Sequence, residues 1–138
     1  MAALSGITAV RPTANTTVNS VVYGATIAAG IPVYRDAADS EHKIADANLS
    51  AAAASAVGIA ITPGVDAGYG LIATGGSIIL VGTTMVVGET YFVGPTAGEI
   101  IPSADAAAAT GSYMTRLGTA ASTTQLDLDI TATGIVRA

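Results

Sequence analysis

Short runs of β-branched and aromatic residues, separated by Gly, Pro, Asn and Asp, recur along this chain. The runs begin about 8 to 12 residues apart, which is the spacing of strands and turns in a β-sandwich or barrel. In the last run, apolar residues alternate with Asp127 and Asp129, so that run predicts a half-buried strand. We therefore predict an all-β fold, a small barrel or sandwich of short strands.

The composition limits how such a fold is built and what it binds. The chain has 138 residues, of which 51% are hydrophobic, 4% aromatic and 11% charged, and it has no Cys. This length is typical of one domain, and the absence of Cys excludes disulfides, thiolate metal sites and cysteine nucleophiles. The net charge of −5 disfavours nucleic acid as a partner. With so few charges on a small domain, we infer that a partner covers part of the surface.

The chain divides into an arm and a domain. Residues 1–20 are rich in Thr, Ala, Ser and Asn, and they predict an extended N-terminal arm that is either disordered or docked on something else. Residues 21–138 predict a single β domain. Neither a signal-peptide pattern nor a long apolar run occurs, so a cytosolic origin without a membrane span is the default expectation.

Two segments of the domain resemble each other. Gly30 matches Gly88 and Gly58 matches Gly118, so we predict pseudo-repeats over about 28–62 and 86–122. Each repeat contains an Ala-rich stretch that predicts a short helical connector. A repeat of strands in so short a chain is typical of a pseudo-symmetric small barrel or sandwich. Between the repeats, Gly75-Gly76-Ser77 predicts a hairpin turn joining strands over 69–73 and 77–81.

The side chains that carry chemistry are sparse. His42 is the one histidine and lies in the most charged stretch of the chain, where an exposed hairpin tip is the simpler interpretation. The acids near it lack the spacing of an EF-hand, which leaves a weak surface calcium site as the lesser alternative. Asp127 and Asp129 lack the aromatic-lined cleft typical of glycosidases. We expect no catalytic, cofactor-binding or metal-binding residue, and no enzyme activity.

Several motifs resemble the capsid decoration, or cement, proteins of tailed bacteriophages. The resemblance covers about residues 20–136. It rests on Ala28–Tyr34, Ile44–Asn48, Val57–Ala60, Thr74–Gly76, Gly88–Val93, Leu117–Ala120 and Leu126–Ile130.

The resemblance implies a virion structural protein, made in the host cytoplasm, that binds the exterior of an assembled capsid. It also implies a homo-oligomer, with a trimer favoured, that bridges copies of the major capsid protein and so stabilises the head. Nucleic acid, membranes and cofactors are not expected as partners. Another phage assembly component, such as a tail, head-fibre or fibre-base subunit, is the alternative, and a carbohydrate-binding or hydrolase domain is the third interpretation.

The contact with the capsid or with other subunits is expected to use the N-terminal arm and two exposed strand ends. An extended, uncharged arm can add a strand to a partner's sheet, and singly dispersed arginines suit ion pairs at a protein contact. The predicted interface residues are Arg11, Pro12, Thr16, Thr17, Val18, Arg35 and Arg116.

Overall fold

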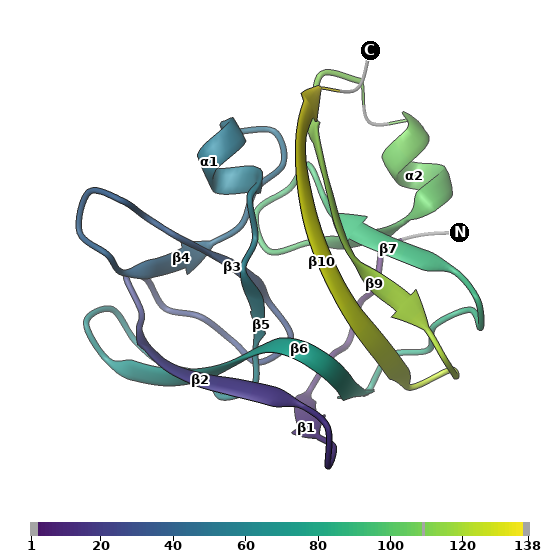
Figure 1. Cartoon of the computed structure of the whole chain (residues 1–138), viewed down its shortest axis with the longest axis horizontal. Helices are drawn as coiled ribbons and strands as arrows, with labels where there is room; N and C mark the ends of the chain where they lie inside the picture. The colour runs from purple at the N-terminus through teal and green to yellow at the C-terminus, as the bar shows by residue number, and fades with distance from the viewer. Residues whose placement is uncertain (1–2, 109, 137–138) are drawn as a thin grey trace.

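A computed structural model describes residues 3–108 and 110–136 and confirms the all-β class. These residues form ten strands, all paired antiparallel, and two short helices, and the sheet curls strongly into a half-barrel (Figure 1). The elements are β1 (Ala9–Pro12), β2 (Thr17–Val22), β3 (Pro32–Arg35), β4 (His42–Ile44), α1 (Ala51–Ala54), β5 (Gly58–Ala60), β6 (Tyr69–Val81), β7 (Thr90–Val93), β8 (Ile100–Pro102), α2 (Ser103–Ala108), β9 (Tyr113–Ala120) and β10 (Gln125–Val136).

Strand β6 is the centre of the sheet. Its first half lies between β2 and β5, and its second half lies between β1 and β10. The hairpin turn predicted at Gly75-Gly76-Ser77 is therefore wrong, because β6 runs without interruption through these residues. The strand bends there instead: Gly76 has a φ of 76°, and the pairing with β2 shifts register next to Gly75.

The N-terminal segment is extended, but it is part of the sheet. β1 and β2 pair with β6 of their own chain, with Pro12 opposite Ile78 and Val22 opposite Tyr69. The segment before β1 is tied to the same domain, since the backbone N–H of Leu4 donates to the carbonyl of Ile100 at 2.9 Å.

Two groups of strands follow the same plan on either side of the centre. The sheet order β4-β3-β5-β6-β10-β9-β7-β8 reads alike from both ends, with a hairpin outermost and a long strand innermost. The first group falls within residues 28–62 and the second within 86–122, apart from the long strands β6 and β10. Both Ala-rich segments contain a short helix, α1 in the first group and α2 in the second.

The two groups meet through irregular backbone hydrogen bonds. Gly98 N–H donates to Ala45 O at 2.9 Å, Ala47 N–H to Gly94 O at 3.0 Å, and Tyr113 N–H to Ala47 O at 2.8 Å. This seam brings alanines of the first group against the larger side chains of the second. The main core contains Ala45, Ala47, Ala54, Ala56, Ile59, Ala73, Ile78, Leu80, Met85, Tyr91, Val93, Ile100, Leu117, Ala120 and Leu126, together with Val10.

A second, smaller core lies on the other face of the first group. It contains Tyr23, Ile27, Val33, Ala60 and Ile72. Tyr23 is fully buried, and its hydroxyl donates to the carbonyl of Thr62 at 2.8 Å. No helix in the described residues is long and apolar enough to cross a membrane.

Candidate interaction surface

The predicted interface residues fall in three places. The first five follow one another along the edge of β6, where Arg11, Pro12, Thr17 and Val18 are exposed and Thr16 is half-buried. Arg35 ends β3 in the first group of strands, and Arg116 lies in β9 in the second group. The described structure therefore gathers the N-terminal residues along one edge and leaves the two arginines on separate groups of strands.

A polar corner holds the N-terminal residues in place between β1 and β2. The Thr16 hydroxyl accepts a hydrogen bond from Thr13 N–H at 2.7 Å and donates to the carbonyl of Ser77. The Asn15 side-chain oxygen accepts from Ser77 N–H at 3.2 Å. Gly76 permits this contact, because a Cβ at that position would lie 2.0 Å from Asn15 O. The corner is thus fixed to the bend of β6, and Thr16 serves the fold.

An uncharged, partly apolar surface lies beside this corner on β2 and β6. In antiparallel strands, residues directly opposite each other point to the same face. Ser20 is opposite Leu71, Val22 is opposite Tyr69, and Val18 follows on the same side. Tyr69 is 80% exposed, and Leu71 and Val18 are each 40% exposed. We call these five residues the β2–β6 face.

The outer edge of β2 adds to this surface. Within the described residues, β2 pairs with β6 alone, so the backbone groups of its other edge face outward. Figure 1 shows β2 in front of β6, with this edge uncovered. Unpaired strand edges and exposed apolar side chains are both features of protein contact sites. The sequence pattern predicted Val18 here but missed Tyr69 and Leu71, because alternation within one strand does not say which face the core covers.

The two arginines make local contacts. The Arg116 guanidinium donates to a carboxylate oxygen of Asp129 at 2.7 Å and to the Thr131 hydroxyl at 3.2 Å. The Arg35 guanidinium donates to the Ser40 hydroxyl at 2.8 Å. Asp127, the other acid of β10, accepts a hydrogen bond from the Ser77 hydroxyl at 2.7 Å. Both acids of β10 therefore join neighbouring strands.

In the charged hairpin between β3 and β4, the environment of His42 differs from the one that the sequence predicted. Lys43 forms ion pairs with Asp36 at 2.7 Å and with Asp39 at 3.0 Å. The hydrogen bond from Lys43 is the main cause of the lowered pKa of Asp36, whereas the pKa of Asp39 is lowered first by the Glu41 backbone N–H and next by Lys43. His42 is buried, at 8% exposure, so the prediction of an exposed tip is wrong for this residue. Among the described residues, no group of three or more His, Cys, Asp or Glu side chains could hold a metal ion.

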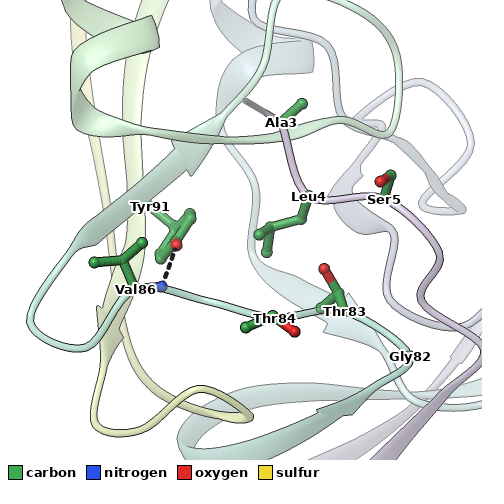
Figure 2. A pocket seen from close by; sticks show the side chains of 8 residues that line it. All are labelled: Ala3, Leu4, Ser5, Gly82, Thr83, Thr84, Val86 and Tyr91. Carbon is green, nitrogen blue, oxygen red and sulfur yellow. Dashed lines mark hydrogen bonds between the residues drawn. The ribbon is translucent and has the colours of Figure 1, made fainter. Parts of the chain in front are cut away.

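A pocket of about 320 Å³ lies between the N-terminal segment and the loop that joins β6 to β7. Figure 2 shows Leu4 and Tyr91 on opposite sides of it, with the Tyr91 hydroxyl turned towards the backbone of Val86. That hydroxyl accepts from Val86 N–H at 3.0 Å. The other lining residues are Ala3, Ser5, Gly82, Thr83 and Thr84, none of them charged. The lining therefore offers hydroxyl groups and apolar contact to a neutral group.

No protein-family model matches the chain, and no curated protein sequence matches it either.

Proposed function

We propose that this chain is a structural protein of a phage virion, which binds the exterior of the assembled capsid and bridges major capsid proteins. The observation that carries the proposal is the β2–β6 face: an uncharged surface with exposed Tyr69 and Leu71, next to the unpaired edge of β2. The motifs that resemble capsid decoration proteins are the reason for proposing the major capsid protein as the partner.

The physical properties of the face suit a protein contact. Tyr combines a large apolar area with a polar tip, and it is enriched where interfaces concentrate their binding energy. The five residues carry no charge, so a partner can cover them without desolvating an ion. The corner at Thr16 holds β2 firmly against β6, which means that little ordering is needed on binding.

Binding to a capsid lattice allows a small contact on each copy to stabilise the whole shell. Many copies on one lattice combine individually weak contacts through avidity. A protein that bridges neighbouring subunits binds the assembled shell and not its separated parts, so it stabilises the assembled state by mass action. Such a shell withstands a higher internal pressure from packaged DNA.

The proposal is tested by co-sedimentation of the purified protein with capsids stripped of it, followed by heating to record the temperature of DNA release. We expect stoichiometric rebinding and a higher release temperature. No binding of the wild-type protein to capsids refutes the proposal. Binding only at tails or at a single vertex favours a tail or fibre component instead.

Substitutions then locate the contact. Tyr69→Asp and Leu71→Asp are expected to weaken capsid binding at least about tenfold, because a carboxylate must lose water in the contact. Leu49→Asp is the matched control, since Leu49 is also highly exposed but lies in the connection between β4 and α1. Equal binding by all three variants, each with an unchanged melting temperature, excludes the β2–β6 face as the contact.

A further inference from the structure

His42 is the one histidine of the chain, and it lies at a structural junction. It begins β4, where it is opposite Arg35 of β3. On its other side it forms a parallel bridge with Tyr23, and its carbonyl accepts from Gly24 N–H at 2.8 Å. The short strand β4 is therefore joined to the small core through the residue that carries the imidazole.

The surroundings of the imidazole suit its neutral form. In the described structure its Nδ1 atom is buried and has no hydrogen-bond partner. Arg35 lies opposite His42 on the same face of the hairpin, and this face also carries Val33 and Ile44 at the small core. A proton on the imidazole would thus place a second positive charge beside Arg35 at the rim of an apolar core.

The acids of the hairpin do not compensate that charge. Asp36 and Asp39 both pair with Lys43, which follows His42 and points to the opposite face of the strand. Glu41 precedes His42, its Cβ lies beside Gly24 as the Lys43 side chain does, and its Oε2 atom is also buried without a partner. Burial, and next the charge of Arg35, lower the pKa of His42 below its ordinary value of 6.5.

We propose that His42 is an acid-sensitive latch, whose protonation releases β4 from Tyr23 and Gly24 while the central sheet stays folded. A buried charge without a partner is costly, and the ring escapes that cost by moving into water. β4 has three residues and, among the described strands, pairs with β3 alone, so its movement leaves the pairing of the central strand β6 intact. Its release uncovers the small core around Tyr23.

The direction of the pH dependence follows from the lowered pKa. The neutral imidazole contributes its full stabilisation above pH 6.5, and this contribution is lost as the pH falls below 6.5 towards the folded-state pKa. The carboxyls of Asp36, Asp39 and Glu89 also have lowered pKa values, and their effects begin at more acidic pH. His is the side chain whose ordinary pKa falls between pH 5 and 8, so His42 is the side chain that we expect to change charge in this interval.

Hydrogen exchange at pH 7.5 and pH 5, corrected for the intrinsic rate at each pH, tests the latch. In the wild-type protein, we expect protection of the Gly24 amide to fall at pH 5, up to tenfold for each unit by which the folded-state pKa lies below 6.5. Amides of β6 should keep their protection. In His42→Gln, which cannot be protonated, the protection of Gly24 should be the same at both pH values.

An NMR titration of the wild-type imidazole provides a second, independent readout that needs no variant. A titration midpoint below 6.5 agrees with the latch, and a midpoint at or above 6.5 overturns it. Equal pH dependence of the Gly24 amide in the wild-type protein and in His42→Gln also overturns it. Neither result depends on capsid binding, so the latch and the proposed function fail separately.

Discussion

The ring of Tyr23 lies directly on the backbone of Gly70, so closely that a Cβ at residue 70 would be 2.2 Å from Tyr23 Cζ. We expect Gly70→Ala to displace the ring and to lower the free energy of unfolding by about 1–3 kcal/mol, the usual cost of overpacking a core. Gly75→Ala on the same strand is the control, because a Cβ there meets only the Thr17 side chain at 3.7 Å. Urea unfolding of both variants measures the difference, and equal losses contradict the prediction.

The bend of β6 permits a similar comparison between two glycines of positive φ. Gly76 has a φ of 76° and Gly88 a φ of 83°, but a Cβ would meet Asn15 O at 2.0 Å in the first case and nothing within 4 Å in the second. Gly88→Ala should cost about 1 kcal/mol for its backbone conformation alone. Gly76→Ala should cost clearly more, since the corner at Asn15 must also move. Thermal unfolding of the two variants measures both losses of stability. A smaller loss in Gly76→Ala than in Gly88→Ala would contradict the prediction.

The buried hydroxyl of Tyr23 is expected to stabilise the small core. Tyr23→Phe removes the hydrogen bond to Thr62 O and should lower the free energy of unfolding by about 0.5–1.5 kcal/mol. Tyr69→Phe removes a hydroxyl from a side chain that is 80% exposed, and it should leave stability unchanged. Chemical denaturation distinguishes them, and an unchanged midpoint in Tyr23→Phe would show that the bond contributes nothing.

The hydrogen bond from Lys43 is the largest cause of the lowered pKa of Asp36. In Lys43→Gln we expect the pKa of Asp36 to rise towards its ordinary value of 3.8 but to remain below it, because Ala38 N–H still donates to the carboxylate at 2.9 Å. Lys43→Arg should keep the low pKa. The stabilisation by this carboxylate is present above pH 3.8 and is lost as the pH falls further. Carboxyl NMR titration reads the pKa directly, and identical values in the two variants would exclude the ion pair as the cause.

The all-β class and most strand positions were predictable, because alternation and turn residues are local signals. β3, β5 and β7 lie within runs of apolar and aromatic residues that the sequence shows directly. The helices α1 and α2 fall within the two Ala-rich stretches. The last strand continues to Val136, beyond the alternating run that ends at Ile130, because β9 pairs with it that far.

Where the sequence predictions were wrong, contacts between residues distant in the chain determine the structure. Gly75-Gly76 has the composition of a turn, but the corner at Asn15 holds it as a bend within a strand. His42 lies among charged residues that indicate exposure, and the segment at Tyr23 covers it. The exposed Tyr69 and Leu71 alternate as core residues would. For these positions, the deciding neighbour is on another strand, which a local pattern does not contain.

The position of β6 as the shared central strand also determines when the chain can fold during its synthesis. β1 and β2 have no partner until the residues of β6, Tyr69–Val81, have left the ribosome, and one edge of the second half of β6 in turn waits for β10, which ends at Val136. The chain must close long loops before these strands can pair, and the entropy that is lost in closing them slows folding. The N-terminal strands thus remain unpaired until β6 has been synthesised, and the half-barrel is complete only once β10 has joined β6.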